Sequence, residues 1–562
     1  MNVVIIGGVA GGVSVATRLR RLSGDAKITV YEKGGFISFA NCGMPYHLSG
    51  TIAKREALLL QTPERMKGMY DVDVLCMHEV TAINRGKKTV TVAGPPGSFE
   101  APYDKLVIAT GAAGRPSGIA GIEHYKNVTN LRDMADLDNL MSYIKDAKKG
   151  LVIGSGFIGL EVVENLRMKG IDLTLVELAP ACLPVMDSEY SKAIERILKE
   201  HGVTVYTGTK VDAYDKETGL FTLSNGVKDG FDFVVTAAGI VPNSKIAKEA
   251  GLELDPRGYI KVSRDSMQTS DPDIYAAGDV SVIYNRITGQ DMTLALAWHA
   301  KRQARIIADH IASGREAPAP TLTQQTFGGA VGTGITKLFE HVIAKTGFTL
   351  AAAKAAGYDA AAIVMHAPDH AAYYPGVTRM ALKVVYDKAT GQLLGAQGLG
   401  QAGVDKRIDA VATAIKSGWT VYDLADMEYA YAPPFNGPKD PLNMIGYVAA
   451  NLDDGLLSLT TFEELPALVD RGAALVDVRY RWEFEQGAIP GSVNIPLDEI
   501  VARHGEIPKG VPVVVICVVG QRAYSGQRML QHFGFEEVYT LEGGTSSYHM
   551  FYPEMFKEDA KA

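Results

Sequence analysis

The chain contains little cysteine: its 562 residues include only Cys42, Cys76, Cys182 and Cys517. Four scattered thiols are too few for a disulfide framework, which excludes the class of small domains that disulfides hold together. No uninterrupted apolar run approaches the roughly 18 residues that a membrane span requires, and the N-terminal residues lack the basic region of a signal peptide. We therefore expect a soluble cytoplasmic protein, without a membrane partner, whose thiols stay reduced unless they turn over.

An excess of positive charge is also missing. The 56 basic residues stand against 64 acidic ones, a formal net charge of −8, and Lys and Arg are dispersed along the chain. This pattern gives no reason to expect nucleic acid or an anionic membrane as a partner. A composition of 47% hydrophobic and 21% charged residues is typical of globular proteins, and the length predicts about three to five domains.

Two glycine-rich turns lie between an apolar strand and a helix. Strands are predicted over residues 2–6 and 151–153, and the helices that follow continue to about residues 22 and 169. The next strand ends at Glu32 in the first copy and at Glu177 in the second, 25 and 23 residues after the first glycine. The absent Cβ atoms permit a tight turn and close approach to a pyrophosphate, and the acid accepts hydrogen bonds from a ribose. The glycines are Gly7, Gly8, Gly11 and Gly12 in the first turn and Gly154, Gly156 and Gly159 in the second.

The two copies together predict two bound dinucleotides. The first copy is imperfect, because Val9 stands at the middle glycine position. After Glu177 come Leu178, Ala179 and Pro180, with no Arg or Lys to receive a 2′-phosphate. The second site is therefore expected to prefer NADH over NADPH.

Further strands and boundaries organise the rest of the chain. Residues 106–111, which close on Thr110 and Gly111, and residues 234–239 are typical of return strands from nucleotide domains, and residues 269–278 lead to Asp279. Composition indicates a linker at residues 317–320 and a second boundary at 451–455; one helix is predicted at 406–417, and strands at 475–479 and 513–516. The predicted domains are residues 1–115 with 241–320, residues 116–240, residues 321–450, and residues 451–562.

Long local motifs carry a resemblance to known families. Residues 38–46 (SFANCGMPY), 366–375 and 431–434 resemble the coenzyme A-disulfide reductases, a branch of the flavin disulfide reductase superfamily. Residues 477–479, 487–496 and the loop opened by Cys517 resemble a rhodanese domain. The tandem is similar to fused coenzyme A-disulfide reductase–rhodanese proteins, which are also described as NADH-dependent persulfide or polysulfide reductases.

This resemblance implies the fold class and the cofactors. It implies an α/β protein with two Rossmann-like dinucleotide-binding domains, for FAD and NAD, an α+β dimerisation domain and a C-terminal rhodanese α/β domain. It also implies FAD, NADH and coenzyme A as ligands, and a homodimer as the assembly. Asp279 resembles the family aspartate beside the flavin ribitol.

Cys42 is the predicted redox thiol of the reductase. Two-cysteine reductases of this fold carry a Cys-x4-Cys pair, but Ile37 and His47 occupy the positions five before and five after Cys42. Cys42 must then store oxidising equivalents as a mixed disulfide, a persulfide or a sulfenic acid, and the resemblance implies a mixed disulfide with coenzyme A. A lowered pKa of Cys42 is needed, since the thiolate is the nucleophile; a neighbouring flavin and a helix N-terminus after Asn41 could supply it.

Other residues are candidates for substrate and proton contacts. Ser38 and Asn41 could hold the cysteamine end of coenzyme A. Arg18 and Arg21 are three apart on the first helix and so share a face, where they could reach the phosphates of coenzyme A or simply be solvated. Glu161 could lie near the nicotinamide or be a solvated helix carboxylate. Tyr374, Tyr431 or Tyr373 could assist the leaving thiolate across a dimer, or be core aromatics.

Cys517 is the predicted sulfur acceptor of the rhodanese-like region. Backbone N–H groups of residues 518–522 can form an anion-binding cup around its Sγ, with Arg522 held against the loop. Asp477 and Arg479 are expected to brace the domain rather than react. Two departures from the family pattern stand out, Ala488 in place of a His, and Val518 with Val519 where thiosulfate-using relatives often carry Arg or Lys. An apolar loop should bind sulfonate poorly, which favours persulfide, polysulfide or elemental sulfur carried on a thiol over thiosulfate.

No metal site is predicted. His366 and His370 are four apart, but Pro368 between them argues against a helix, and no Cys or Glu completes a ligand set. Cys76 and Cys182 lack a motif and are interpreted as structural.

The leading hypothesis is NADH- and FAD-dependent reduction of coenzyme A persulfide or polysulfide with release of sulfide. One alternative is reduction of coenzyme A disulfide for thiol homeostasis. Another is an NADH oxidase or peroxidase in which Cys42 cycles through sulfenic acid. A third, from a different class, makes the C-terminal region a sulfur-carrier or protein-docking module.

Overall fold

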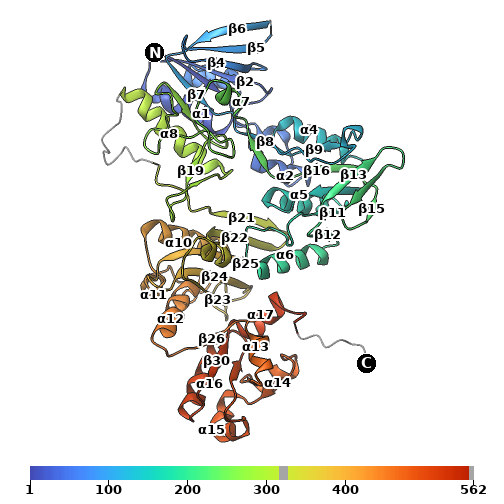
Figure 1. Cartoon of the computed structure of the whole chain (residues 1–562), viewed down its shortest axis with the longest axis vertical. Coiled ribbons are helices and arrows are strands. Elements are labelled where there is room, and N and C mark those ends of the chain that lie inside the picture. Colours follow the sequence, from blue (N-terminus) through green and yellow to red (C-terminus); the bar gives the residue numbers. More distant parts are fainter. Residues whose placement is uncertain (96, 315–326, 556–562) are drawn as a thin grey trace. The chain divides into compact units, whose positions relative to one another are not determined.

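The computed structural model describes residues 1–95, 97–314 and 327–555 of the chain (Figure 1). The predicted linker at residues 317–320, and with it the domain limit at residue 320, lies outside these ranges. The described chain divides into two compact units, one of Met1–Cys182 with Leu198–Ala330 and one of Leu183–Ile197 with Val331–Ala562. Each unit is described by itself.

The first unit contains a five-stranded parallel sheet in the order β18-β7-β1-β2-β3. Its central strand alternates between two cores: Val3 and Ile5 face a cluster that includes residues of helices α1 and α8, and Val4 and Ile6 face a second cluster. A sheet that is buried on both faces explains the nearly continuous apolar run of β1. The elements are β1 (Asn2–Ile6), α1 (Ala10–Leu22), β2 (Lys27–Glu32), β3 (Asp73–Cys76), β7 (Lys105–Ile108), β18 (Ile274–Ala276) and α8 (Ala297–Ser313).

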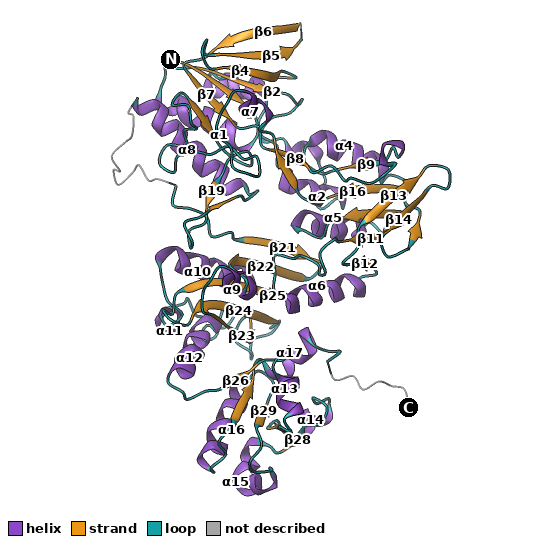
Figure 2. Ribbon diagram, in the orientation of Figure 1, coloured by secondary structure: helices purple, strands orange, loops and turns teal. Residues whose placement is uncertain are grey.

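A second five-stranded parallel sheet in the same unit has the order β12-β11-β10-β16-β9. Strand β8 (Ala112–Gly114) lies where the chain passes between the two sheets (Figure 2), and it pairs antiparallel with β17 (Ile240–Pro242). The elements of the second sheet region are β9 (Val128–Thr129), α4 (Met134–Tyr143), β10 (Lys149–Ile153), α5 (Phe157–Met168), β11 (Asp172–Val176), β12 (Thr204–Tyr206) and β16 (Phe233–Thr236).

Smaller elements complete the first unit. Two three-stranded antiparallel sheets are formed by β4-β5-β6 and β13-β14-β15, and β19 pairs with β20. Their bounds are β4 (Glu79–Asn84), β5 (Thr89–Gly94), β6 (Gly97–Pro102), β13 (Val211–Asp215), β14 (Leu220–Leu223), β15 (Lys228–Asp229), β19 (Ile283–Tyr284) and β20 (Asp291–Met292). The short helices are α2 (Met44–Leu48), α3 (Pro63–Tyr70) and α7 (Lys245–Glu249).

The second unit begins with a five-stranded antiparallel sheet, β21-β22-β25-β24-β23, in which β23 is an edge strand. The predicted helix at 406–417 is confirmed as α10, but the structure adds three helices that the sequence did not predict, and α12 extends through residues 451–453 of the predicted boundary. Residues 183–197, which include most of helix α6 (Ser188–Glu200), belong to this unit. The elements are β21 (Gly334–Leu338), β22 (His341–Gly347), α9 (Leu350–Ala355), β23 (Ala360–Pro368), β24 (Arg379–Asp387), β25 (Leu393–Gly400), α10 (Val404–Ser417), α11 (Asp423–Asp426) and α12 (Pro441–Asp453).

The C-terminal part of the second unit is a parallel sheet of order β26-β30-β29-β27-β28. Its central strand β29 again alternates: Val513 and Val515 face one buried cluster, and Val514 and Ile516 face another. The strands are β26 (Leu459–Thr460), β27 (Ala474–Asp477), β28 (Val493–Asn494), β29 (Val513–Ile516) and β30 (Val538–Leu541). The helices are α13 (Leu465–Asp470), α14 (Arg481–Glu485), α15 (Ile500–Arg503), α16 (Gln521–His532) and α17 (Gly544–Phe551).

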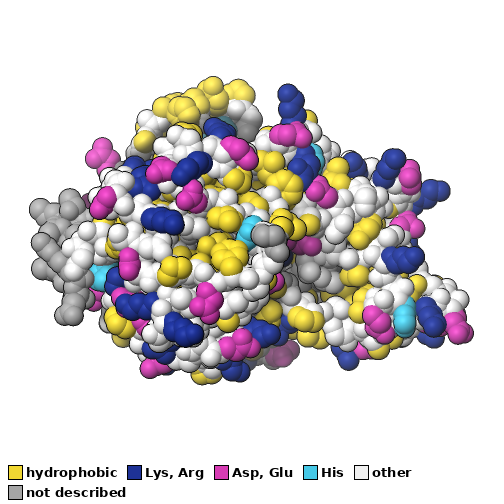
Figure 3. All heavy atoms as spheres, turned by 90° about the horizontal axis from the view of Figure 1, so that it is seen from above, with side chains coloured by type: hydrophobic (Ala, Val, Ile, Leu, Met, Phe, Trp, Pro, Cys, Tyr) yellow, Lys and Arg dark blue, Asp and Glu magenta, His cyan; other side chains and the backbone are white. Residues whose placement is uncertain are grey.

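The fold class predicted from the sequence is confirmed by these sheets. On the face shown in Figure 3, Lys and Arg side chains are interspersed with Asp and Glu, which agrees with the dispersed basic residues of the sequence. Within the described ranges, no helix is both long and apolar enough to cross a bilayer.

Candidate functional site

The first glycine-rich turn connects β1 to α1 and is closed by the acid at the end of β2. Glu32 accepts hydrogen bonds from the N–H groups of Gly8 and Gly34, both at 2.7 Å. Gly7 has a φ of +102°, and a Cβ on Gly12 would lie 1.9 Å from the carbonyl oxygen of Gly7. Packing within the protein therefore requires glycine at both of these positions. Gly11 differs, because a Cβ there would make only ordinary contact, 3.5 Å from the Ala109 side chain.

The second glycine-rich turn repeats this geometry between β10 and α5. Glu177 accepts from the N–H of Ser155 at 2.7 Å, from its hydroxyl at 2.8 Å and from the N–H of Ala179 at 2.8 Å. A Cβ on Gly159 would lie 1.9 Å from the Gly154 carbonyl oxygen, whereas a Cβ on Gly156 would meet nothing within 4 Å. Glycine at residue 156 thus leaves open space at the start of α5, where helix N–H groups favour an anion.

Polar side chains converge on Asp279, just after strand β18. Arg132 donates from Nη2 to Asp279 Oδ2 at 3.2 Å and to the Ala112 carbonyl at 2.9 Å, and His299 Nε2 lies 3.9 Å from Asp279 Oδ1. Arg132 Nε and His299 Nδ1 are buried and find no hydrogen-bond partner among the described residues. Buried polar atoms are rarely left unsatisfied, so these atoms fit a polar ligand bound against Asp279.

The end of β7 is fixed by a reciprocal pair of hydrogen bonds. The Thr110 hydroxyl donates to the Asn243 carbonyl, and the Asn243 side chain donates to the Thr110 carbonyl, both at 2.8 Å. Gly111 follows with a φ of +65°. The hydroxyl and the carbonyl of Thr110 are therefore hydrogen-bonded within the protein. Thr110 follows the carboxyl end of a parallel strand, which is where open α/β sheets bind ligands.

Cys42 is exposed and lies in a 3-10 turn, Asn41–Gly43, immediately before helix α2. The helix that the sequence analysis expected after Asn41 therefore starts only at Met44, and it is five residues long. Surrounding protein atoms raise the pKa of the Cys42 thiol by desolvation, and the Glu161 carboxylate raises it further. The expected lowering of this pKa is thus not produced by the side chains of the chain itself.

Glu161, on helix α5, lies near the same region. Its carboxylate hydrogen-bonds the hydroxyl of Tyr46 on α2, and desolvation, followed by the charges of Glu161 and Glu164, raises the pKa of Tyr46 to about 12. Glu161 is half-buried. The structure therefore places Glu161 beside the thiol and Tyr46 rather than in bulk solvent.

A Glu161→Gln substitution is expected to lower the pH at which Cys42 becomes reactive. The carboxylate opposes ionisation of the thiol, so a neutral amide favours the thiolate at a given pH. The measurement is the pH dependence of Cys42 alkylation by iodoacetamide, resolved by peptide mass spectrometry. Tyr46→Phe is the matched control, because it removes the hydroxyl but keeps the Glu161 charge. An unchanged midpoint in the Gln variant would contradict the assigned electrostatics.

The residues predicted to contact the substrate, Ser38, Asn41, Arg18 and Arg21, differ in their surroundings. Ser38 adopts a left-handed backbone (φ +44°) and its N–H donates to the Gly8 carbonyl at 2.9 Å, so the segment that leads to Cys42 is tied to the first glycine turn. Asn41 and Arg21 are exposed. Arg18 is engaged within the protein, because its Nε donates to Asp309 Oδ1 at 2.8 Å.

The three candidate tyrosines lie in the second unit and are exposed. The Tyr373 and Tyr431 hydroxyls are 3.3 Å apart, and this hydrogen bond raises the pKa of Tyr373. Tyr374 packs edge-on against the His370 ring at 5.7 Å. Relative exposures of 75%, 42% and 49% for Tyr373, Tyr374 and Tyr431 exclude a role as core aromatics.

Cys517 opens a tight loop between β29 and α16. Its residue is 1% exposed, and Sγ accepts a hydrogen bond from the Gly520 N–H at 3.1 Å. Gly520 has a φ of +99°. One of the predicted cup donors, the N–H of residue 520, therefore points at the sulfur.

Arg522 is held by Glu483, a residue that the sequence analysis did not identify. Two hydrogen bonds of 2.6 and 2.8 Å join the guanidinium to the carboxylate, and the guanidinium lies 5.6 Å from the centre of the Tyr480 ring. The pair with Glu483 raises the pKa of Arg522, and the nearby Cys517 sulfur acts in the same direction. Arg522 is thus close to the thiol with its charge balanced.

Asp477 and Arg479 form a buried ion pair in the same domain. Arg479 Nε and Nη2 reach Asp477 Oδ2 at 2.9 and 2.7 Å, and Nη2 also donates to the Gly487 carbonyl at 2.8 Å. Side chains committed in this way brace the domain, the role expected from the sequence.

The two histidines considered as metal ligands are His366 and His370. His366 is on strand β23, so the segment is not a helix, and His370 Nδ1 hydrogen-bonds Asp369 Oδ2 at 2.6 Å. Within the described ranges, no cluster of three or more His, Cys, Asp or Glu residues has the arrangement to hold a metal ion. Cys182 is buried and Cys76 is half-buried.

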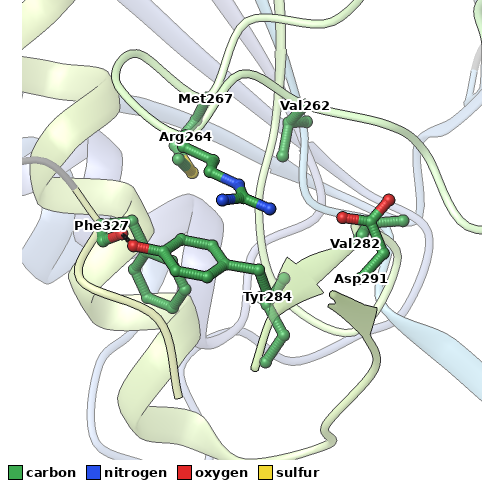
Figure 4. Close-up of a pocket in the computed structure, with 8 residues that line it drawn as sticks. Val262, Arg264, Met267, Val282, Tyr284, Asp291 and Phe327 are labelled. Atoms are coloured by element: carbon green, nitrogen blue, oxygen red, sulfur yellow. Dashed lines mark hydrogen bonds between the residues drawn. The ribbon is translucent and has the colours of Figure 1, made fainter. Parts of the chain in front are cut away.

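A small pocket elsewhere in the first unit contains none of the predicted residues (Figure 4). The Arg264 guanidinium lies 4.1 Å from the centre of the Tyr284 ring, whose hydroxyl donates to the Phe327 carbonyl. The rest of the pocket is lined by Val262, Met267, Val282, Ile283 and Asp291. These contacts describe packing rather than catalytic chemistry.

Four residues of the two site regions were missed by sequence reasoning: Arg132, His299, Tyr46 and Glu483. Arg132 and His299 carry no local motif, and only the fold brings them to Asp279. Tyr46 lies inside the quoted motif of residues 38–46, so that motif was the available signal, although it did not indicate the contact with Glu161.

Comparisons with known proteins agree with this architecture. Residues 1–304 match the family described as pyridine nucleotide-disulphide oxidoreductase, residues 335–440 match the dimerisation domain of that family, and residues 461–550 match the rhodanese-like domain. A coenzyme A disulfide reductase of Staphylococcus haemolyticus is 36% identical over 455 residues, which cover 80% of this chain and 100% of that protein. The crystal structure of reduced Bacillus anthracis CoADR-RHD is 40% identical with a TM-score of 0.93 and covers 98% of both chains. A NAD-dependent persulfide reductase from A. fulgidus is 36% identical with a TM-score of 0.91, covering 98% of this chain and 100% of that one.

Proposed function

Because the chain belongs to the pyridine nucleotide-disulphide oxidoreductases and carries a rhodanese-like domain, we propose that it uses NADH and FAD to reduce coenzyme A persulfide or polysulfide. The observation that carries the proposal is a single exposed thiol, Cys42, facing the nucleotide-binding helix through Glu161. A second thiol, Cys517, in an anion-binding loop of the same chain, suits a substrate that contains sulfane sulfur.

The cofactor sites are proposed from the two glycine turns. Gly7, Gly8, Gly11, Gly12 and Glu32, with Thr110, Gly111 and Asp279, would hold FAD, and Gly154, Gly156, Gly159 and Glu177 would hold NADH. The open space at Gly156 and the unsatisfied atoms of Arg132 and His299 support these assignments. FAD held there would supply two-electron transfer between NADH and sulfur.

Cys42 is the proposed nucleophile. Its thiolate attacks the coenzyme A sulfur of the persulfide, which forms a Cys42–coenzyme A disulfide, breaks the S–S bond of the substrate and releases HS⁻. Two electrons derived from NADH then cleave the mixed disulfide to the Cys42 thiolate and the coenzyme A thiolate. The thiolate of coenzyme A and HS⁻ each take up a proton, so that the persulfide, NADH and one proton give coenzyme A, H₂S and NAD⁺.

Several residues are proposed to hold coenzyme A around this thiol. Asn41 and Ser38 flank Cys42 in sequence and would contact the cysteamine end. Arg21, exposed, and Arg18, which would have to leave or share Asp309, are the proposed phosphate contacts. Proton donation to the leaving thiolate is proposed for the hydroxyls of Tyr373 and Tyr431 or for that of Tyr374, supplied by a second subunit through the dimerisation domain.

Cys517 is proposed to accept the outer sulfur of a persulfide or polysulfide. The Gly520 N–H at 3.1 Å stabilises negative charge on Sγ or on the added sulfur. Val518 and Val519 offer no cation for a sulfonate, which supports a persulfide or polysulfide over thiosulfate as the donor.

Reduction of coenzyme A disulfide is the second candidate. It is favoured by the Staphylococcus haemolyticus coenzyme A disulfide reductase, whose whole length is matched by this chain. In that case the chemistry at Cys42 is the same, and the leaving group is a second coenzyme A rather than sulfide.

The deciding experiment measures NADH oxidation and sulfide release by the FAD-loaded protein. Coenzyme A persulfide, coenzyme A disulfide and inorganic polysulfide are compared at equal concentrations. We expect kcat/KM for the persulfide to exceed that for the disulfide, with one sulfide released for each NADH. Equal or better turnover of the disulfide would overturn the proposal in favour of the second candidate.

A further inference from the structure

Residues 542–547, here called the 542–547 turn, comprise the link from β30 to α17 and the first turn of α17, and they support the backbone of the Cys517 loop. The N–H of Thr545 donates to the Cys517 carbonyl at 2.9 Å, and the N–H of Ser546 donates to the Val518 carbonyl at 3.0 Å. A Cβ on Gly544 would lie 2.0 Å from the Cys517 carbonyl oxygen, so the loop and the turn are in direct backbone contact. A shift of this turn must therefore move the carbonyls of Cys517 and Val518.

The same turn is also bonded to the edge strand β23 of the antiparallel sheet. Glu542 Oε1 accepts a hydrogen bond from the Val364 N–H at 2.8 Å. Two residues further along β23, His366 Nε2 lies 2.8 Å from the Ser547 hydroxyl. One short segment thus connects the sulfur-binding loop to the sheet of the dimerisation domain.

These contacts are buried, which makes them costly to disturb. His366 is 3% exposed and Ser547 is 2% exposed. Burial lowers the pKa of His366 to about 3, so its imidazole is neutral and acts through the hydrogen bond to Ser547. Burial raises the pKa of Glu542 to about 7, against the opposing effects of the Val364 N–H and of Lys383.

Asp187 and the α6 residues Glu189 and Tyr190 also contact this junction. Lys383, opposite Val364 on β24, bonds Glu189 at 2.5 Å and Asp187 at 2.9 Å. The fully buried Tyr190 packs its ring 4.8 Å from that of Phe551 on α17. The junction is therefore anchored on both sides of the turn and has little freedom to adjust when one contact is removed.

We propose that the 542–547 turn sets the geometry of the Cys517 loop from the dimerisation sheet, which makes His366, Glu542 and Ser547 positioning residues for sulfur transfer. None of the three contacts the sulfur; they act through the carbonyls of Cys517 and Val518. Their effect on the reaction is to keep the Gly520 N–H directed at Sγ. The inference rests on the proposed function only in taking Cys517 as the sulfur carrier.

The test uses the full FAD-loaded chain with inorganic polysulfide as donor and cyanide as acceptor. The Cys517 thiolate attacks the terminal sulfur of the polysulfide, an S–S bond breaks and a shorter polysulfide anion leaves. Cyanide then removes the outer sulfur as thiocyanate and regenerates the Cys517 thiolate. The variants are Ser547→Ala, His366→Leu, the double variant and the conservative His366→Gln, with Ser525→Ala on the exposed face of α16 as matched control.

We expect Ser547→Ala and His366→Leu each to slow thiocyanate formation about three- to tenfold, the range of one buried hydrogen bond. The double variant should be no slower than the slower single variant, because both remove the same contact. His366→Gln should recover much of the rate. Peptide-resolved alkylation of Cys517 should slow in parallel, since the thiolate loses the aligned Gly520 N–H, while NADH-dependent reduction of coenzyme A disulfide stays unchanged.

Three results would overturn the inference. The first is that both single variants form thiocyanate, and have their Cys517 alkylated, at the same rates as the Ser525→Ala control. The second is that the losses of rate in the double variant are additive. The third is that the reductase activity falls in parallel with thiocyanate formation. If His366→Leu does not fold, Ser547→Ala, which removes one oxygen, decides alone. If the unaltered chain transfers no sulfur, the proposed function fails at Cys517, and the alkylation rates still test the positioning.

Discussion

A Cys42→Ser variant loses NADH-dependent reduction of coenzyme A persulfide and of coenzyme A disulfide alike, by at least about 10³-fold. A serine hydroxyl is a poor nucleophile and cannot form the mixed disulfide that carries the substrate sulfur. No second thiol can substitute, because Ile37 and His47 stand where a partner cysteine would be. The measurement is NADH oxidation together with sulfide release.

The same variant provides its own control. Its bound FAD should still be bleached by NADH, because the two glycine turns are untouched, so the electrons reach the cofactor and stop there. Substantial turnover of either substrate by Cys42→Ser would mean that electrons leave the cofactor by a route that does not include this thiol, and the proposed function would have to be withdrawn.

A Cys517→Ser variant is expected to lose transfer of sulfur from polysulfide to cyanide by at least about 10²-fold. The hydroxyl keeps the Gly520 N–H partner but does not accept sulfur. Reduction of coenzyme A disulfide should remain at the level of the unaltered chain, since that reaction needs only Cys42. The separation of the two activities is the informative part of the result.

Persulfide turnover in Cys517→Ser distinguishes a catalyst from a docking module. A reduced rate with polysulfide as the supplied donor indicates that Cys517 passes sulfur towards Cys42. Full persulfide and polysulfide turnover would instead support the docking interpretation, in which the C-terminal domain recruits a partner. Cys182→Ser is a suitable control, because that thiol is buried and carries no motif.

The dinucleotide-binding elements could be predicted almost residue by residue. The first strand and the first helix lie where the pattern indicated, at Asn2–Ile6 and Ala10–Leu22, and the strand predicted to end at Glu177 is β11, Asp172–Val176. The reason is local: glycines that a turn requires and apolar runs that a buried parallel strand requires are both written in short sequence windows.

The antiparallel region of the second unit was less predictable. Helices α9, α11 and α12 were missed, and the last of these extends into a predicted boundary. The N-terminus of α12 is capped by Asp440 and Asn443. The Asp440 side chain accepts from backbone N–H groups of the first helical turn, and the Asn443 side chain accepts from the Asp440 N–H. The predicted boundary rested on Asn451, Asp453, Asp454 and Gly455, residue types that are also typical of loops, but α12 continues to Asp453 and Asp454 is its C-cap.

Electrostatics at the thiol could not be predicted from the motif. The motif indicated activation of Cys42, but desolvation and Glu161, 119 residues away in the chain, act in the opposite direction. The convergence of Arg132 and His299 on Asp279 was equally invisible, because three distant segments meet there only in the folded unit. Sequence patterns identify the reacting atom; its environment is a property of the tertiary structure.

The bond from the Val364 N–H to Glu542 has a consequence for any shortened form of this chain. Bare sheet borders recruit other polypeptides by strand addition, and natural proteins cover or charge them. Here the cover is the C-terminal domain itself. Truncation of the chain after α12 would expose the backbone donors of β23 and leave Lys383 beside an uncovered sheet edge. The truncated protein should therefore self-associate through that edge.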